Sequence, residues 1–380
     1  MAMREEQKQI QQLARDIAVT DLAPQATALD RECGFPTAGL RRLADAGLMG
    51  MVVPLPLGGS GGDTVSFVAA VEEIAKACAN TALVLVTHLA VCMGILASGS
   101  DQIKSRLLSP LAKGEKLGAF AATEAGSGAN VFAAETSARR DDGTYVINGS
   151  KIFVTSGAEA DVYIVAARTS PAPGPAGLSL ILVERDTPGL TIGRVEQRLG
   201  MNGTSSSELF FDECTVPEEN LLGQEGGYMQ AAMPVLGVAL LGAGSISVGL
   251  ARAALEASIN HAKSRTVGGQ PIGAHQGVQF LMSEMSCQVE AAQALLFEAA
   301  HSRDEGQAGP PILPLETKLF ATEMAVDVTN KALQVHGGHG YTRELPLERY
   351  LRDARGLTLH FLPSEMLKET LGMMLLGMSP

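Results

Sequence analysis

The spacing of apolar residues changes twice along the 380 residues of this chain, and that change constrains the fold more than any other feature. Residues 1–117 carry apolar side chains at helical spacing, for example Ile10, Leu13 and Ile17. Beyond them the spacing falls to two, which is typical of strands, and from Tyr228 long helical runs return. Strands and helices do not alternate, so the pattern predicts an α+β fold and no Rossmann-type unit.

The changes in spacing predict three domains. We expect an N-terminal α-helical domain at 1–117, a middle β domain at 118–226 and a C-terminal helical bundle at 227–380. Inside the middle domain, Asn148-Gly149 lies between two alternating runs, and these residue types supply the positive φ values of a two-residue hairpin turn. We therefore predict a hairpin there, with further strands at 162–167, 178–183 and 208–211.

One uncharged segment is long enough to cross a membrane. Residues 231–251 carry no charge, yet they include Pro234, four glycines and two serines, which favours a helix buried inside the protein over one in lipid. The N-terminus is charged and lacks the apolar core of a signal peptide. The five cysteines are odd in number and show no paired spacing, which argues against disulfides and metal sites. These observations predict a cytoplasmic protein that is not embedded in a membrane.

The charge balance restricts the partners. A net charge of -12 argues against nucleic acid, because phosphate binding needs clustered lysines and arginines. Residues 334–365 hold the densest set of groups that could meet a ligand: a glycine pair followed by Arg349, Arg352 and Arg355. His88 is a polar residue in an apolar helical run, where a histidine is more often a satisfied core residue than a functional one. The expected partner is a small molecule or another protein.

Five stretches, in this order and spacing, resemble the acyl-CoA dehydrogenase superfamily of flavoproteins over essentially the whole chain. The resemblance implies an N-terminal helical domain, a β-barrel-like middle domain and a C-terminal four-helix bundle, with FAD as cofactor and a homodimer or homotetramer as the assembly. It also implies an acyl thioester as substrate and electron-transfer flavoprotein or O₂ as electron acceptor. The stretches are FAATEAGSGAN (120–130), KIFVTSGA (151–158), LGMNGTSSSELFFDECTVPEENLLG (199–223), SRTVGGQPIGAHQ (264–276) and QVHGGHGYTRELPLERYLRDAR (334–355).

The resemblance also assigns FAD contacts to positions in this chain. Thr123 and Thr155 match the hydroxyls at the isoalloxazine edge, and Phe153 matches a residue that shields one flavin face. Arg265 matches an arginine that pairs with the pyrophosphate. The remaining matched positions hold the dinucleotide of a neighbouring subunit: Gln276, Gln334, Gly337 and Gly338.

The chain departs from the family at the catalytic base. In most members a glutamate nine residues after the arginine of RDA removes the α-proton, and counting from Arg352 reaches Phe361. An alternative base used by some relatives matches Ala239, which is followed by Leu240 in place of an arginine. Phenylalanine and alanine cannot accept a proton, and losing a positioned base typically costs about 10²- to 10⁴-fold in rate. Dehydrogenation by the usual route is therefore doubtful.

Several hypotheses about the function stay open. The first is oxidoreduction of an acyl thioester, bound to CoA or to a carrier, with an unusual base such as His88. The second is a flavin monooxygenase that uses His88 and His360. The others are a base-less subunit of a hetero-oligomeric dehydrogenase, a desulfinase-like enzyme and a flavoprotein without catalysis. We place thioester oxidoreduction first, because residues 334–355 resemble true dehydrogenases more closely than monooxygenases.

Overall fold

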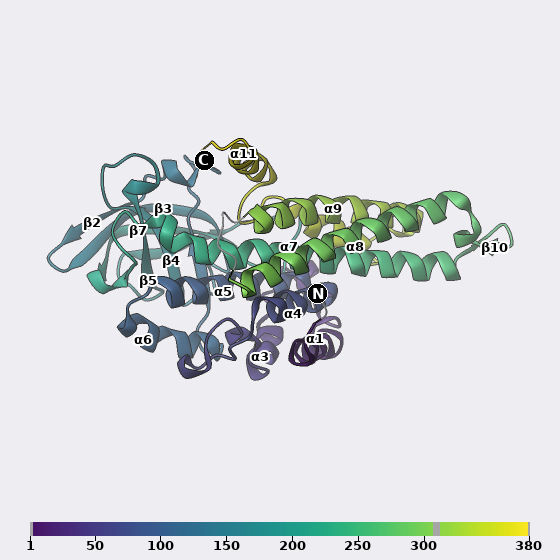
Figure 1. Cartoon of the computed structure of the whole chain (residues 1–380), viewed down its shortest axis with the longest axis horizontal. Helices are drawn as coiled ribbons and strands as arrows, with labels where there is room; N and C mark the ends of the chain where they lie inside the picture. The colour runs from purple at the N-terminus through teal and green to yellow at the C-terminus, as the bar shows by residue number, and fades with distance from the viewer. Residues whose placement is uncertain (1–2, 307–311, 379–380) are drawn as a thin grey trace.

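The computed structural model describes residues 3–306 and 312–378. It confirms the predicted α+β fold, with helices, then a sheet, then helices (Figure 1). Within the predicted helical region, the extended backbone of Cys78 separates α4 from α5. The helices before the sheet are α1 (Glu5–Ile17), α2 (Ala26–Glu32), α3 (Thr37–Asp45), α4 (Thr64–Ala77), α5 (Ala79–Ser98) and α6 (Asp101–Ala112).

The middle region forms one mixed sheet of eight strands. Seven of its strands run in the order β6-β7-β3-β2-β4-β5-β8, and the eighth, β1, pairs with β4 in parallel. One face of β4 packs on α5, α6 and the start of α7, while its other face packs on β3 and β7. The strands are β1 (Gly118–Ala121), β2 (Ser137–Asp141), β3 (Thr144–Thr155), β4 (Val162–Arg168), β5 (Leu178–Glu184), β6 (Leu190–Val195), β7 (Ser206–Pro217) and β8 (Leu221–Leu222).

The predicted hairpin turn at Asn148-Gly149 is wrong. Strand β3 runs through both residues, and the turn that joins β2 to β3 is Asp142-Gly143, with φ values of 40° and 77°. Gly149 instead sits at a shift in the register between β3 and β7, where an added Cβ would come within 2.6 Å of the Thr136 hydroxyl. Two such turn signals lie six residues apart, and the pairing of β3 with β2 decided which one turns the chain.

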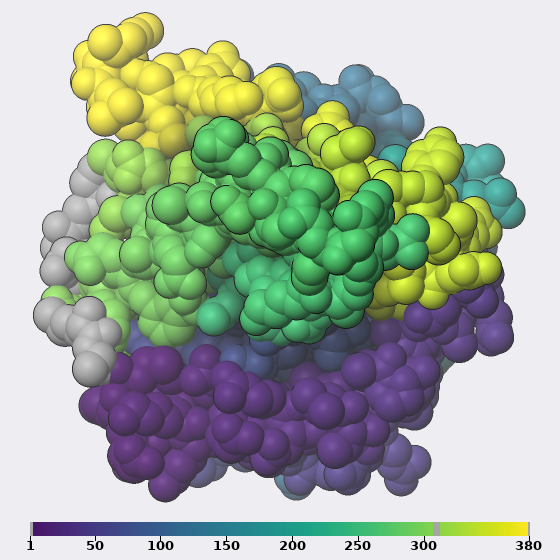
Figure 2. Space-filling view, turned by 90° about the vertical axis from the view of Figure 1, so that its right-hand side faces the viewer, coloured from purple at the N-terminus to yellow at the C-terminus, as the bar shows by residue number. Residues whose placement is uncertain are grey.

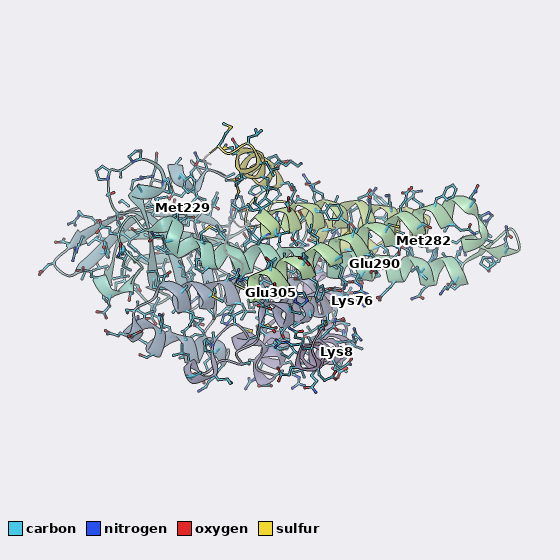
Figure 3. All side chains as sticks on the ribbon, in the orientation of Figure 1. Lys8, Lys76, Met229, Met282, Glu290 and Glu305 are labelled. Carbon is cyan, nitrogen blue, oxygen red and sulfur yellow. The ribbon has the colours of Figure 1, made fainter. Side chains whose placement is uncertain are left out.

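Long helices make up the C-terminal region and run side by side away from the sheet (Figure 1). Figure 2 views this region from its far end, with the helices lying above the N-terminal ones. Many side chains along these helices reach outward, as the sticks of Figure 3 show. The elements are α7 (Tyr228–Ser264), β9 (Thr266–Val267), β10 (Gln270–Pro271), α8 (Gln276–Asp304), α9 (Ile312–His336), α10 (Leu347–Leu357) and α11 (Ser364–Leu375).

Two described helices, Ala79–Ser98 and Tyr228–Ser264, are long and apolar enough to cross a membrane by length and composition. In each, 78% of the most apolar window is buried inside the protein. The two helices pack on each other and on α4, and their apolar residues form much of the largest core cluster. The burial expected for residues 231–251 is therefore found, and it is satisfied within the fold.

Candidate active site

A cavity of about 1600 Å³ lies between the sheet and the C-terminal helices. Its wall comes from the loop after β1, the end of β3, the first part of α7, the facing ends of α8 and α9, and the segment after α10. Most of the lining side chains are apolar. Ordinary small-molecule sites measure about 300–1,000 Å³, so this cavity has room for a large ligand or for two ligands together.

Three predicted flavin-contacting residues line this cavity together: Thr123, Phe153 and Thr155. The backbone N–H of Ile152 donates to the carbonyl of Thr123 at 2.9 Å, which holds the loop after β1 beside the end of β3. Neither threonine hydroxyl bonds to another described residue. Phe153 has a φ of 55° at a bulge in β3, and 58% of its surface is exposed. Two unpaired hydroxyls and an exposed ring on one wall fit the edge and face of a planar heterocycle such as isoalloxazine.

The other predicted cofactor residues lie away from the cavity, at the end of the bundle farthest from the sheet (Figure 1). Arg265 and Gln276 flank the β9–β10 hairpin, and Gln334 and the pair Gly337-Gly338 lie at the end of α9. A Cβ added to either glycine would meet nothing within 4 Å, so this surface is open. One chain therefore does not bring both groups of residues to one ligand. The assignment of Gln276, Gln334, Gly337 and Gly338 to the dinucleotide of a neighbouring subunit stays a prediction.

His88, a predicted catalytic residue, lies in the core and not on the cavity wall. Its Nδ1 accepts the backbone N–H of Gly118 at 3.2 Å, so its Nε2 carries the proton and donates to the carbonyl of Leu111 at 3.1 Å. Burial lowers the pKa of His88 to about 4. The ring thus ties α5 to α6 and β1 as a neutral group with both nitrogens in use. These contacts are those of a satisfied core histidine.

His360, the other predicted catalytic residue, is half-buried on the cavity wall. Its Nδ1 lies 2.8 Å from the carbonyl of Gly356, which can only accept, so Nδ1 carries the proton and Nε2 has a free lone pair. No described residue bonds to Nε2. Burial lowers the pKa of His360 to about 4; the Gly356 hydrogen bond opposes this effect, and the charges of Arg198 and Lys318 add to it. His360 is therefore neutral at pH 7.

Phe361 lies beside His360 on the same wall with a φ of 62°, which is uncommon for a bulky residue. Lys318 on α9 holds this segment from behind: its Nζ donates to the carbonyls of Leu362 at 2.7 Å and Thr358 at 3.4 Å. Burial lowers the pKa of Lys318 to about 8. Strain of this kind persists where the surroundings fix the backbone, and here a buried lysine contributes to that fixation.

Glu124 is a carboxylate on the cavity wall, but its oxygens are occupied. It accepts the Nζ of the buried Lys151 at 2.6 Å and the backbone N–H groups of Glu135 and Thr136 at 2.7 and 3.0 Å. Burial would raise the pKa of Glu124, but the hydrogen bonds from Lys151 and Thr136 outweigh it and lower the pKa. Glu124 is therefore held as an ion whose two oxygens already accept hydrogen bonds, so neither is free to take a proton from a substrate.

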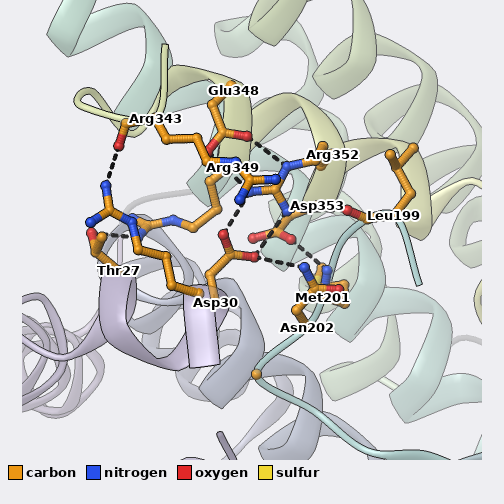
Figure 4. A network of polar contacts seen from close by, with 12 residues as sticks. Thr27, Asp30, Leu199, Met201, Asn202, Arg343, Glu348, Arg349, Arg352 and Asp353 are labelled. Atoms are coloured by element: carbon orange, nitrogen blue, oxygen red, sulfur yellow. Dashed lines mark hydrogen bonds and ion pairs between the residues drawn. The ribbon is translucent and has the colours of Figure 1, made fainter. Parts of the chain in front are cut away.

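The sequence suggested that the arginines of residues 334–365 could bind a ligand, but Arg352 makes contacts within the protein instead. Arg352 forms a two-bond pair with Asp30 at 2.9 and 2.6 Å and also bonds to Glu348, which fastens α10 to α2 (Figure 4). Asp353 accepts the backbone N–H of Met201 at 2.5 Å. A second cavity of about 240 Å³ lies beside this network, and several of its polar lining groups, including Asp30 and Glu348, are already hydrogen-bonded within the network. We therefore place the site in the larger cavity.

Sequence reasoning missed three basic residues around the site. Lys318 positions the segment that carries Phe361, and Arg198 and Arg303 line the cavity. Arg198 donates from Nη2 to the carbonyl of Met201 at 2.7 Å, while its Nε and Nη1 have no partner in the described structure. A lysine within the apolar run of α9 was the one usable signal, because a buried cation needs a partner.

Comparison with known proteins gives a consistent result along the chain. Models of the acyl-CoA dehydrogenase N-terminal, middle and C-terminal domains match residues 4–115, 119–214 and 227–376. An acyl-CoA dehydrogenase of Bacillus subtilis is 38% identical over 378 residues, covering 99% of this chain and 100% of that protein. An acryloyl-CoA reductase (NADH) of Anaerotignum propionicum is 40% identical, covering 93% of this chain and 90% of that protein.

Solved structures agree with the sequence comparison. The butyryl-CoA dehydrogenase of Megasphaera elsdenii superposes with a TM-score of 0.96 at 34% identity, covering 99% of each chain. A match of this extent includes all three regions of the chain.

Proposed function

Because this chain belongs to the acyl-CoA dehydrogenase family of FAD-dependent oxidoreductases, we propose that it oxidises or reduces an acyl thioester with His360, not a carboxylate at position 361, as the proton-transfer group. The observation that carries the proposal is the hydrogen bond from Nδ1 of His360 to the carbonyl of Gly356, which leaves Nε2 unprotonated on the cavity wall. Phe361 occupies the position of the usual base and cannot perform this step.

The residues on the cavity wall fit the flavin end of FAD, and Thr123, Phe153 and Thr155 would hold it. Arg265, with Gln276, Gln334, Gly337 and Gly338, would hold the dinucleotide of a neighbouring subunit, which makes a homodimer or homotetramer the working unit. FAD, when bound, supplies a hydride acceptor or donor beside the substrate.

In this proposal His360 accepts the proton from the carbon next to the thioester carbonyl. Its low pKa keeps Nε2 unprotonated at neutral pH, so the basic form is fully populated. In the opposite direction, the imidazolium returns the proton to the same carbon. The apolar wall excludes water, which would otherwise compete for the proton.

The monooxygenase reading needs His88 and His360 beside the same atom. The contacts of His88 with Gly118 and Leu111 keep it in the core, so only one of the two histidines would be available. This favours thioester oxidoreduction. We further propose electron-transfer flavoprotein as the electron acceptor and the cytoplasm as the location.

The test is anaerobic mixing of the FAD-loaded enzyme with a panel of acyl-CoA esters while the flavin band at about 450 nm is followed. We expect bleaching by at least one ester and a large loss of rate in His360→Gln. Adding Phe361→Glu to that variant should restore part of the rate, because a carboxylate would return to the family's base position. Unchanged bleaching in His360→Gln would refute His360 as the base. A flavin peroxide absorbing at about 370 nm on reaction of the reduced enzyme with O₂ would favour oxygenation instead.

A further inference from the structure

Arg303, near the end of α8, places a positive charge on the wall of a largely apolar cavity. The apolar lining of this cavity includes Leu236 and Leu240 of α7 and Leu313 and Leu315 of α9. Burial lowers the pKa of Arg303, with only Asp304 opposing that effect. An arginine remains charged in proteins, so this side chain is a partly desolvated cation facing an apolar space.

The backbone of α7 makes room for this guanidinium. A Cβ added to Gly237 would lie 1.9 Å from the Nη1 of Arg303, so the side chain rests against the helix where a glycine leaves space. Glycine inside a helix is less stable than alanine. At this position the missing side chain has a physical use, which is to seat the arginine on the cavity wall.

Arg303 differs from the other arginines on this wall in its hydrogen bonds. Arg198 donates to the Met201 carbonyl, Arg352 to Asp30, and Arg355 to the hydroxyl of Thr358. Across residues 3–306 and 312–378, no hydrogen bond or ion pair of the Arg303 side chain is found. Five N–H donors on the wall of a cavity therefore remain available to a ligand.

The nearest acidic residue is already engaged. Asp304 accepts the backbone N–H groups of Thr64 at 2.8 Å and Val65 at 3.1 Å, where it caps the start of α4. A carboxylate used at a helix N-terminus is stabilised there, and Asp304 makes no hydrogen bond or ion pair with the neighbouring guanidinium in the described structure. The charge of Arg303 is thus left for an incoming anion.

We propose that Arg303 binds an anionic group of the thioester substrate, either a phosphate of its carrier or a carboxylate on its acyl chain. The inference rests on the proposed function, since it takes a thioester as the ligand of this cavity. The guanidinium fork matches both anions in two-bond geometry, and the apolar surroundings strengthen the contact because water does not screen it. Arg303 would then help to determine which thioesters bind.

Calorimetric titration of the FAD-loaded enzyme with three thioether analogues tests this proposal. Thioethers lack the carbonyl that acidifies the α-proton, so binding is measured without chemistry and independently of His360. S-propylpantetheine carries no anion, S-propyl-CoA adds phosphates, and S-(3-carboxypropyl)pantetheine adds a carboxylate. The proteins are wild type, Arg303→Met and, as a matched loss of charge outside the cavity, Arg139→Met on β2.

We expect Arg303→Met to weaken one anionic analogue by about 10- to 100-fold while leaving S-propylpantetheine unchanged. Loss with S-propyl-CoA identifies the phosphate as the ligand, and loss with the carboxylated analogue identifies the acyl carboxylate. Equal binding of all three analogues by wild type and variant, or an equal loss for all three, overturns the proposal. Arg139→Met should bind every analogue as the wild type does.

A second pair of variants guards against a folding artefact. Arg303→Lys keeps the charge but not the fork, so it should bind the same analogue with intermediate affinity. Gly237→Ala pushes the guanidinium from its seat and should weaken the same analogue selectively. FAD content and melting temperature are compared with those of the wild type for each variant. Selective loss in Arg303→Met with no effect in either of these variants counts against the proposal.

Discussion

Two histidines in this molecule share a low pKa but lie in regions that use them differently. Burial lowers the pKa of both His88, in the middle of α5, and His360, in the segment after α10, to about 4. Both ring nitrogens of His88 form hydrogen bonds with backbone groups, whereas only Nδ1 of His360 does so and the ring lies on the cavity wall. The difference teaches that a shifted pKa identifies a buried group, while a free nitrogen beside a cavity identifies a candidate base.

The two regions also differ in their backbone. His88 lies inside a regular helix, and the chain at Phe361 has a positive φ held in place by Lys318. A helix interior offers one well-defined conformation, so α5 can be buried without strain. The segment after α10 keeps its shape through tertiary contacts, which is common where a backbone shapes a ligand site.

The largest expected contrast is in reaction rate. His360→Gln should slow anaerobic flavin bleaching by about 10²- to 10⁴-fold, because it removes the free nitrogen from the cavity wall. His88→Gln should leave that rate within about threefold, since its ring does not line the cavity. Stopped-flow absorbance at about 450 nm measures both. A larger loss in His88→Gln than in His360→Gln would reverse the comparison.

The next contrast is in the pH dependence of stability. The folded-state pKa of His88 lies below its unfolded value of about 6.5, so between pH 6.5 and 4 the folded state binds fewer protons than the unfolded state. Stability is therefore lost as pH falls through this window, by up to about 3 kcal/mol for a fully buried group. We expect the free energy of unfolding, measured by urea denaturation, to fall less between pH 6.5 and 4 in His88→Gln than in the wild type.

His360 provides the comparison for that measurement. Its pKa is lowered to the same value, so linkage predicts an acid loss of similar size that His360→Gln should also reduce. A reduction by only one of the two substitutions would mean that the two rings do not share the same folded-state pKa.

A third contrast is the cost of removing hydrogen bonds at neutral pH. His88→Leu leaves the buried N–H of Gly118 and the carbonyl of Leu111 without the ring, which should cost about 1–3 kcal/mol of unfolding free energy. His360→Leu exposes only the Gly356 carbonyl near a cavity and should cost less than about 1 kcal/mol. Urea denaturation at saturating FAD compares them, and similar costs would contradict the structural role of His88.

The smallest expected effect separates the two backbones. At position 361 glycine should be more stable than alanine by about 1 kcal/mol, because glycine adopts positive φ without a Cβ penalty. At Ala90, two residues from His88 on α5, glycine should be less stable than alanine by about 1 kcal/mol. Comparing Phe361→Gly with Phe361→Ala and Ala90→Gly with wild type by thermal unfolding gives the two signs. The same sign at both positions would remove the distinction.

Much of the fold was predictable because it depends on local pattern. The periods of 3.6 and two gave the order of helices and strands, and the uncharged stretch of α7 gave its burial. The hairpin at Asn148-Gly149 was missed because two similar turn signals compete, and strand pairing chose Asp142-Gly143. Local chemistry proposes a turn, and the register of the sheet selects it.

The site divides in the same way. Family motifs in the sequence placed Thr123, Phe153 and Thr155 together, and the cavity contains all three. The cluster at 334–365 looked like one ligand-binding unit, yet its glycines lie at the end of the bundle, Arg352 pairs with Asp30, and His360 reaches the cavity. Residues that are close in the sequence can lie far apart in the structure, because the helices between them place their ends in different parts of the molecule.

The sequence by itself determined the order of helices and strands, the resemblance to a family that uses FAD, and the presence of Phe361 at the position of the usual base. Only the tertiary structure showed that both ring nitrogens of His88 are hydrogen-bonded in the core and that His360 lies on the cavity wall. The groups that bind His88, Leu111 and Gly118, lie 23 and 30 residues away in the chain. Packing of α5 against α6 and β1 brings them to the ring, and no local propensity encodes that meeting. The free Nε2 of His360 likewise depends on which side of its segment faces the cavity.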